Sequence, residues 1–312
     1  MPNGRRIDGG RRRVAAAVCA HNDAAFLADA VASLMRQTLP ERDYEVVVVD
    51  NASTDDTGPV LCDLQGRYGR RLRVCWEERT GLSHARNLAL AVAGAPIVAF
   101  IDADAVADPG WLEGILAAFR QAGPVAVVGG PVRIRWDQPR PRWWSSRLDE
   151  ALNAYEPGRE PMVLGYPRYP YGTNFALRVD AAGAVGGFAT VLGRCGQTLG
   201  AGEEGELCLR LARAGWEIRF APDVVVHHRT VPDRLSRRYV LRRAFNHGRS
   251  QYMIESMHGF ESGRYGSWTD VLGRVTANLL RLRCDLPFLK FTLFRAGYQY
   301  ERTRTRASAS GR

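Results

Sequence analysis

Two aspartates, Asp102 and Asp104, stand two positions apart directly behind an apolar run, in the segment FIDADAVADPGWL (100–112). On an extended segment, residues two apart point to the same side, so both carboxylates can converge on one ligand. Two carboxylates this close repel each other unless a cation or hydrogen-bond donors lie between them. Mg²⁺ and Mn²⁺ prefer oxygen ligands and commonly bind substrate phosphates as well. The pair therefore predicts a divalent metal site that carries a phosphate group.

The alternative is that one of these aspartates merely caps the helix that follows. Asp108 is better placed for that task, because Pro109 fits the first position of a helix. We therefore expect Asp108 to cap this helix, which leaves Asp102 and Asp104 free for a ligand.

Acidic residues recur at two other predicted element ends. Asp50 ends the run YEVVVVD (44–50), where it can accept a hydrogen bond from a ligand N–H. Glu203 and Glu204 begin the amphipathic segment GEEGELCLRLARAG (202–215). A glutamate there either acts as a general base or complements the positive N-terminus of the helix.

A histidine pair, His227 and His228, ends the run WEIRFAPDVVVHH (216–228). An imidazole at a strand end is either a metal ligand or a neutral side chain bonded to the backbone. The residues alone leave both interpretations open.

The elements that must position these residues alternate regularly. Strands are predicted at 14–20, 44–50, 72–78 and 95–102, and helices at 23–37, 53–68 and 83–93. This alternation predicts the α/β class, with a mostly parallel sheet flanked by helices. Ligands of open α/β sheets bind beyond the carboxyl ends of the strands, which is where the acidic residues lie.

The second part of the chain is less regular. We expect a helix at 109–121, single strands at 126–136 and 216–228, and ordered structure again at 172–178. Between them, residues 137–171 are rich in Pro, Arg and aromatic residues, including Trp143 and Trp144. Loops this long are commonly functional, and aromatic faces stack on sugars, so we expect this loop to bind a substrate.

Positive charge is concentrated near the C-terminus. The chain of 312 residues has a net charge of +10, and residues 234–312 alone hold 16 Lys and Arg against 5 Asp and Glu. A basic helical region of this kind suits an anionic membrane surface or nucleic acid. It does not account for the acids at the strand ends.

The cysteines indicate a reducing compartment. All six are scattered without CxxC spacing, which favours free thiols over disulfides or a zinc site. The apolar stretch after Arg13 is too short for a typical export signal, and no run approaches the roughly 20 residues of a membrane-spanning helix. We expect a cytoplasmic protein, with peripheral contact at the inner face of the cell membrane through its basic C-terminal region.

Four segments together resemble the inverting family 2 glycosyltransferases of GT-A type. They are AVCAHNDAAFLADAVASLMRQ, VVVVDNASTDDT, GLSHARNLALAVAGAPIVAFIDADA and GEEGELCLRLARAGWEIRFAPDVVVHH. They occur in this order between about residues 14 and 250, and the tail 251–312 adds nothing to the likeness. The resemblance implies a GT-A fold with a Rossmann-like, mostly parallel sheet, here followed by a helical C-terminal extension.

The resemblance also implies a nucleoside diphosphate sugar as donor and Mg²⁺ or Mn²⁺ as cofactor. Asp102 would contact the ribose or the metal, Asp104 would bind the metal, and His228 would be a further ligand. Uridine is the expected base, with thymidine and guanosine left open.

Four other residues match the donor side of the family. Asp50 resembles the acid that pairs with the uracil edge, and Asn22 would lie near the base. Arg86 and Asn87 match a segment that runs beside the donor pocket.

The acceptor side is implied by Gly172, Thr173 and Asn174, which resemble the strand leading into the sugar site, and by Glu203. The aromatic loop would add Trp143 and Trp144. The expected acceptor bears a hydroxyl group and is a glycan, a lipid or a small natural product, and no nucleic acid is expected as a partner.

Glu204 matches the position of the general base, with one departure from the family. The family usually places Asp there, and the extra methylene of Glu extends the carboxylate by about 1.5 Å. A carboxylate at this position would remove the proton of the acceptor hydroxyl as it attacks.

Two other classes of function fit parts of the sequence. The run VAFIDADAV (98–106) also resembles haloacid-dehalogenase phosphohydrolases, in which Asp102 would be the nucleophile. That family places its motif near the start of the fold, whereas four strand–helix elements precede it here. A non-catalytic protein that binds membrane or nucleic acid would use only the basic tail. A Rossmann dehydrogenase is disfavoured because no G-x-G-x-x-G follows the first strand.

We therefore divide the chain into four parts. Residues 1–12 form a disordered basic tail, 13–130 the nucleotide-sugar-binding half of one domain, 131–233 its acceptor-binding and catalytic half, and 234–312 a basic helical extension.

Overall fold

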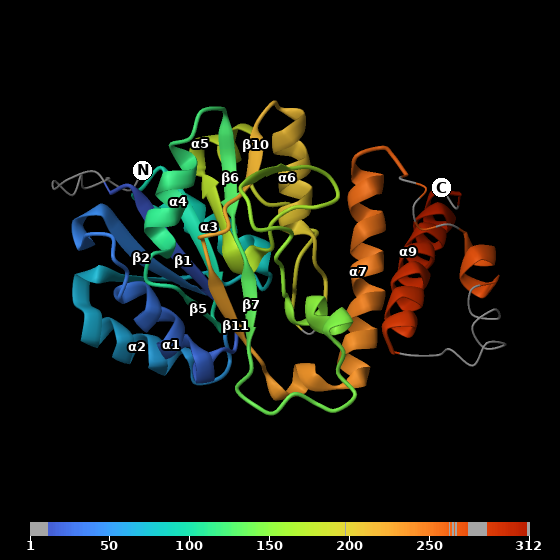
Figure 1. Cartoon of the computed structure of the whole chain (residues 1–312), viewed down its shortest axis with the longest axis horizontal. Coiled ribbons are helices and arrows are strands. Elements are labelled where there is room, and N and C mark those ends of the chain that lie inside the picture. The colour runs from blue at the N-terminus through green and yellow to red at the C-terminus, as the bar shows by residue number, and fades with distance from the viewer. Residues whose placement is uncertain are drawn as a thin grey trace.

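A central sheet flanked by helices runs through the computed structural model (Figure 1). It has eight strands in the order β3-β2-β1-β4-β9-β6-β10-β8. The structure describes residues 12–196, 198–261, 263, 265, 267–273 and 286–310. The predicted residues 1–11 of the N-terminal tail lie outside this part, whereas Arg12 is described and forms an ion pair with Glu45 at 2.5 Å.

The first four strands confirm the predicted parallel sheet. They are β1 (Val14–Ala20), β2 (Tyr44–Asp50), β3 (Leu72–Trp76) and β4 (Ile97–Asp102), and β1 pairs in parallel with both β2 and β4. The intervening helices are α1 (Ala24–Met35), α2 (Thr57–Tyr68) and α3 (Leu82–Val92). The carboxyl ends of the four parallel strands lie at one edge of the sheet, as expected for this topology.

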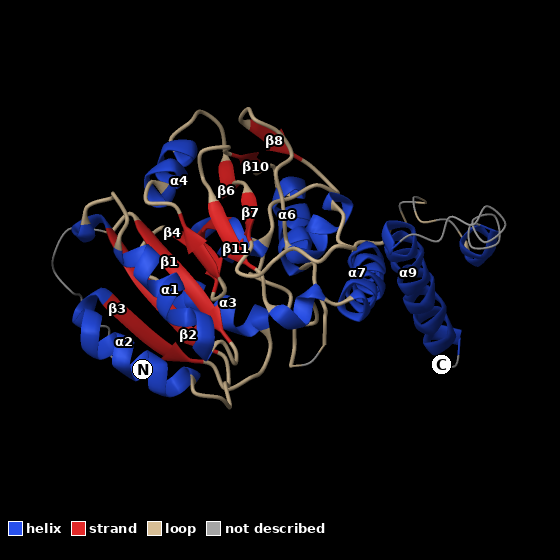
Figure 2. Ribbon diagram, turned by 60° about the horizontal axis from the view of Figure 1, so that its bottom comes forward, coloured by secondary structure: helices blue, strands red, loops and turns tan. Residues whose placement is uncertain are grey.

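Side chains of β1 alternate between two apolar layers, which is why both faces of the sheet are covered. Val14, Ala16 and Val18 pack in the layer that contains α1, α2 and α4 (Trp111–Phe119). Ala15 and Ala17 face the layer that contains α3, α5 (Val179–Ala184) and α6 (Glu203–Arg213). The layered arrangement is visible in Figure 2.

Both parts of the predicted domain contribute to this one sheet. β9 (Phe175–Arg178) inserts between β4 and β6 (Val125–Gly129) and is antiparallel to both. β10 (Glu217–Phe220) pairs in parallel with β6, and β8 (Met162–Leu164) closes the edge. β8 lies within the segment that we expected to be a loop.

Two predicted single strands are each broken into two. Residues 126–136 form β6 and then β7 (Val132–Arg135), and residues 216–228 form β10 and then β11 (Val226–Arg229). Proline explains each break, because Pro131 and Pro222 cannot donate a ladder hydrogen bond.

The second halves of these strands build a small sheet, β5-β11-β7, in which β5 spans Ala105–Ala107. In β11, His228 is paired directly opposite Ala105. Because β5 begins one residue after Asp104, this pairing brings a histidine from far along the chain to the two aspartates.

The predicted cap of α4 is wrong. The helix begins at Trp111 without a side-chain cap, and only the backbone carbonyl of Asp108 accepts the Trp111 N–H. The Asp108 carboxylate instead contacts His227 Nε2 at 3.0 Å. Asp102 and Asp104 nevertheless take no part in capping this helix.

The described part of the C-terminal region is largely helical, as predicted. After the short helix η5 (Pro232–Leu235), α7 (Arg237–Met257) and α9 (Leu286–Ser310) pack side by side at one end of the molecule (Figures 1 and 2). A Cβ on Gly248 would lie 1.8 Å from the Phe294 carbonyl, and one on Gly297 would lie 1.9 Å from the Phe245 carbonyl. The two helices therefore touch backbone to backbone. None of the described helices is long and apolar enough to cross a membrane.

Candidate functional site

A cavity of about 330 Å³ opens where β1 and β4 end. Its walls come from these strand ends, the aromatic loop, the start of α6 and one face of α7. Seven of the predicted site residues line it, namely Arg86, Asp102, Asp104, Gly172, Thr173, Glu203 and Glu204.

Asp102, Asp104 and His228 come together as the predicted metal group. Ligand atoms of all three lie within 4.8 Å of one another. His228 Nε2 is 3.2 Å from Asp104 Oδ1 and 4.0 Å from Asp102 Oδ2. Two carboxylates and one imidazole form a donor set suited to Mn²⁺ or Mg²⁺.

Two of the three residues of the metal group are buried, Asp102 is partly exposed, and the imidazole has a free nitrogen. Asp104 and His228 are both buried, and His228 Nδ1 has no hydrogen-bond partner among the described residues. The other nitrogen, Nε2, therefore carries the polar contacts of the ring and faces the carboxylates. This orientation fits a metal ligand.

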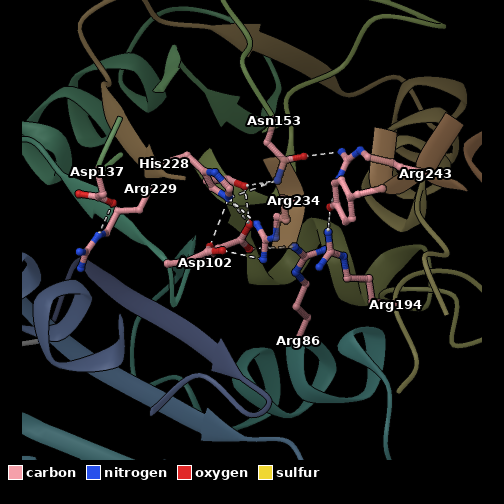
Figure 3. Close-up of polar contacts among 12 residues, drawn as sticks. Arg86, Asp102, Asp137, Asn153, Arg194, His228, Arg229, Arg234 and Arg243 are labelled. Atoms are coloured by element: carbon pink, nitrogen blue, oxygen red, sulfur yellow. Dashed lines mark hydrogen bonds and ion pairs between the residues drawn. The ribbon is translucent and has the colours of Figure 1, made fainter. Parts of the chain in front are cut away.

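Arg234 was not predicted, yet it contacts this group directly. Its Nη2 lies 2.7 Å from Asp104 Oδ2, and its Nη1 lies 3.4 Å from His228 Nε2 (Figure 3). Burial alone would raise the pKa of the Asp104 carboxyl, but His228 and Arg234 hold it well below its usual range. Asp104 thus stays ionised and able to bind a cation.

Arg86 joins the aspartates to the glutamates. It is buried, and its Nη1 lies 2.8 Å from Glu203 Oε1 and 3.0 Å from Glu204 Oε1, while its Nη2 lies 4.0 Å from Asp102 Oδ1. Burial and the neighbouring charge of Glu204 raise the pKa of Glu203 to about 7. One guanidinium thus orients both carboxylates at the start of α6, and Glu204 reaches the cavity.

Gly172 is needed for this geometry. It begins the short helix η4 (Gly172–Asn174), and a Cβ there would lie 1.9 Å from Glu204 Oε1 and 2.0 Å from Arg86 Nη2. Next to it, the Thr173 hydroxyl donates a hydrogen bond to Asp102 Oδ2. This segment therefore contacts Glu204 through Gly172 and Asp102 through Thr173.

Two predicted donor residues do not line the cavity but hold a turn beside it. Asn22 Oδ1 accepts the backbone N–H groups of Thr54 at 2.7 Å and Asp55 at 3.3 Å. Asp50 Oδ1 accepts the N–H of Ser53 at 3.1 Å. Both side chains thus stabilise the connection between β2 and α2.

The predicted amides Asn87 and Asn174 are also occupied within the protein. Asn87 exchanges two hydrogen bonds with the backbone of Phe188, at 2.8 and 2.9 Å. Asn174 accepts from Trp111 Nε1 at 2.9 Å and donates to the Pro131 and Val224 carbonyls. Neither side chain lines the cavity.

The aromatic loop lines the cavity through its tyrosines and not through Trp143 and Trp144. Trp144 is buried and donates to Asp149 at 2.8 Å, and it packs with Trp143 against the core between the short helix η3 (Ser146–Leu152) and α7. The indole rings therefore dock the loop and do not face a ligand. The cavity is lined instead by Tyr166, Tyr169 and Tyr171.

Several cavity residues were missed. They include Asp23, Asn153, Glu150, Arg194, Arg234 and four residues of α7, Arg243, His247, Gln251 and Ile254. The spacing of the α7 residues, four, four and three, defines one face of a helix and is a signal that the sequence contains. For Asp23, Arg194 and Arg234 we find no such signal.

The wall that α7 provides is tied to α9. Glu255 is fully buried and accepts the hydroxyls of Tyr166 at 2.8 Å and Tyr298 at 2.6 Å. Gln251 also donates to Glu255, at 3.1 Å. A cavity residue, α7 and α9 thus share one buried carboxylate.

Comparison with known proteins identifies relatives of this chain among glycosyltransferases. The profile described as Glycosyl transferase family 2 matches residues 16–186, more than half of the chain. The succinoglycan biosynthesis protein ExoM of Rhizobium meliloti (strain 1021) is 29% identical over 238 residues, which cover 75% of this chain and 73% of that protein. A glucosyl-dolichyl phosphate glucuronosyltransferase of Haloferax volcanii is 24% identical over 249 residues, covering 79% and 78%.

A solved structure shows the same fold. The mannosyltransferase PcManGT from Pyrobaculum calidifontis, in complex with GDP-Man and Mn²⁺, superposes with a TM-score of 0.66 at 20% identity, covering 94% of this chain and 87% of that one. The family match sets aside the phosphohydrolase and the non-catalytic interpretations. The chain belongs to glycosyl transferase family 2, an inverting family of GT-A fold, and is a nucleotide-sugar-dependent glycosyltransferase.

Proposed function

We propose that the protein moves a sugar from a nucleoside diphosphate donor to an acceptor hydroxyl, with Glu204 as general base. The observation that carries this proposal is the position of Arg86, which contacts Glu204 at 3.0 Å and reaches Asp102 at 4.0 Å across the same cavity. A donor bound at the aspartates would therefore present its sugar toward Glu204.

Glu204 would accept the proton of the acceptor hydroxyl while that oxygen attacks the anomeric carbon. The bond to the diphosphate breaks on the opposite face, so the anomeric configuration inverts. Arg86 holds the carboxylate in place, and Gly172 leaves room for it. Glu203 would support this arrangement from behind and complete the acceptor side.

Asp102, Asp104 and His228 would hold Mg²⁺ or Mn²⁺. A divalent ion bound there would neutralise charge on the leaving diphosphate. The chain's own contribution is a preformed group of ligands, in which Thr173 holds Asp102 and Arg234 holds Asp104.

The donor base is proposed to be uridine, with thymidine and guanosine left open, and the Pyrobaculum calidifontis mannosyltransferase structure contains GDP-Man. Asn22 and Asp50 would position the connection between β2 and α2 next to the base. Asn87 would hold the part of the donor pocket beside Arg86. We propose that residues 13–130 supply most donor contacts and residues 131–233 most acceptor contacts.

The acceptor would enter past the tyrosines of the aromatic loop and α7. Thr173 would face it, whereas Asn174, Trp143 and Trp144 would support the wall from behind. A glycan, a lipid or a small natural product fits these contacts, and a lipid acceptor would suit peripheral membrane contact through the basic C-terminal helices.

Replacement of Glu204 by glutamine tests the proposal. Glu204→Gln should lower kcat by about 10²–10⁴-fold while donor binding is retained, since a proton acceptor is lost and little else. Glu206→Gln is the matched control, because Glu206 bonds Arg210 and His258 outside the cavity. Sugar transfer by Glu204→Gln at the rate of the control would remove Glu204 from the role.

A further inference from the structure

Four arginines line the cavity, and they fall into two kinds. Arg86 is paired with Glu203 and Glu204, and Arg234 is paired with Asp104. Arg194 and Arg243 differ, because no carboxylate of the described residues lies within 4.0 Å of either guanidinium. Their charges are therefore open to an anionic ligand.

These two guanidinium groups converge on one hydroxyl. Arg194 Nη2 lies 3.3 Å from the Tyr239 hydroxyl oxygen and Arg243 Nη1 lies 3.5 Å from it, from opposite parts of the chain (Figure 3). Arg243 is held in this position by a hydrogen bond to Asn153 Oδ1 at 2.5 Å. Like charges brought together in this way repel each other unless an anion lies near them.

The neighbouring acid does not serve as that anion. Glu150 lines the same side of the cavity but is paired with Lys290 of α9 at 2.7 Å and accepts from the Tyr171 hydroxyl. His247, one turn along α7 from Arg243, adds no positive charge near neutral pH, since burial and Arg243 lower its pKa to about 4. The local field is thus positive because of the two arginines.

The pKa of Tyr239 reflects the same positive charge. Burial alone would raise the pKa of Tyr239, but Arg243, Arg194 and Arg234 outweigh burial and lower it to about 8. An environment that favours a phenolate favours other oxyanions as well.

We propose that Arg194, Arg243 and the Tyr239 hydroxyl form a phosphate-binding site on the α7 side of the cavity, separate from the Asp102–Asp104–His228 group. Guanidinium forks bind phosphate oxygens with two N–H donors each, and the hydroxyl adds a third direction. All three residues lie beyond the segment 16–186 that matches the family profile. The site needs no metal, because its own groups supply the positive charge.

The phosphate has two possible sources, and this part rests on the proposed function. It belongs either to the diphosphate of the donor or to a phosphate group on the acceptor. Both share the tetrahedral oxyanion that the two arginines recognise, and a competition experiment separates them.

Calorimetric titration with inorganic pyrophosphate in EDTA tests the site without any sugar transfer. Arg194→Gln and Arg243→Gln should each weaken binding by about tenfold or more, the loss expected for a charge-assisted hydrogen bond. Arg242→Gln is the matched control, because it removes the same charge from an exposed neighbour on α7. Equal affinity of Arg194→Gln, Arg243→Gln and the control would overturn the proposal.

Repeating the titration with inorganic phosphate at saturating UDP and Mn²⁺ identifies the source. If UDP abolishes phosphate binding, the site holds the donor diphosphate. If phosphate still binds and that binding is lost in Arg194→Gln, the site holds an acceptor phosphate. Both results support the site.

Two further variants keep the test decisive if Arg243→Gln does not fold. Arg243→Gln removes the contact with Asn153, so its fold is checked by circular dichroism, and Tyr239→Phe with Arg194→Gln carries the test if that variant unfolds. Glu204→Gln should bind pyrophosphate as wild type does. If sugar transfer does not depend on Glu204 but pyrophosphate binding depends on Arg194 and Arg243, the proposed function fails and this site stands. If transfer depends on Glu204 but pyrophosphate binding does not depend on the two arginines, this site fails and the proposed function stands.

Discussion

Two walls of the cavity are built in different ways. The core wall consists of Asp102, Asp104, Gly172 and Glu204, which the sheet and the start of α6 supply. Backbone pairing fixes the two aspartates, since Asp102 ends a strand between two neighbours and β5 is paired with β11 directly after Asp104. Their positions leave little freedom.

The α7 wall consists of Arg243, His247, Gln251 and Ile254 on one face of a long helix. Its groups are cationic, neutral or apolar, whereas the core wall is acidic. Any of these side chains can change without breaking a sheet hydrogen bond. Under the proposed function, we expect the core wall to perform the reaction and the α7 wall to select what reacts.

The largest expected effect follows from closing the space beside Glu204. Gly172→Ala would place a Cβ 1.9 Å from the Glu204 carboxylate, so the base and Arg86 must move. A displacement of about 1 Å costs on the order of 10²-fold in rate, and we expect kcat to fall at least that far. Gly183→Ala, at a helical glycine with open space around it, is the control. Normal turnover by Gly172→Ala would show that the base tolerates movement.

A smaller effect is expected from the metal group. Asp104→Asn keeps the shape of the side chain but removes its charge, so Mn²⁺-dependent binding of a nucleoside diphosphate should weaken by at least about tenfold. Calorimetry with Mn²⁺ and with EDTA measures this. Asp108→Asn is the control, because Asp108 contacts His227 away from the cavity. If the metal dependence of binding is unchanged in Asp104→Asn, the metal does not bind at Asp104.

Gln251→Ala tests whether the α7 wall selects the acceptor. Loss of one side chain that lines the cavity should raise the acceptor KM by roughly three- to tenfold with little change in kcat, the pattern of a lost binding contact. Asn246→Ala, on α7 but outside the cavity, should leave both constants unchanged. If kcat falls as far as in Gly172→Ala, the division between the two walls disappears.

The smallest effect concerns pH. The folded-state pKa of His247 is lowered from 6.5 to about 4, so protonation favours the unfolded chain and stability decreases as pH falls from about 6.5 toward 4. His247→Gln should remove this loss, roughly 2 kcal/mol between pH 7 and pH 5. Thermal unfolding of both proteins at the two pH values measures the difference. Parallel curves would mean that His247 titrates normally.

The parts of the site that the sequence predicts are those fixed by a repeating pattern. Strand–helix alternation located Asp102 and Asp104 at the ligand edge, because parallel strands end together. The pairing of β11 with β5 does not follow from the pattern, because residues 216–228 are typical of one strand and only Pro222 divides them into two.

Side-chain direction explains the remaining errors. Trp143 and Trp144 lie on the expected loop, but an indole buries more apolar area against a helix than in a polar cavity. Asn87 and Asn174 are close to the site in sequence and space, yet their amides satisfy backbone groups that would otherwise be buried without partners. Such choices depend on tertiary neighbours that no local pattern contains.

The glycine contacts between α7 and α9 have a consequence for how the cavity can adapt. Since Gly248 and Gly297 each meet a carbonyl of the other helix, neither helix can slide or roll without a steric collision. Tyr298 extends this constraint through Glu255 to Tyr166 at the cavity. The last helix thus holds α7 and Tyr166 in place, so a substitution in α9 can shift the cavity wall without contacting a bound molecule.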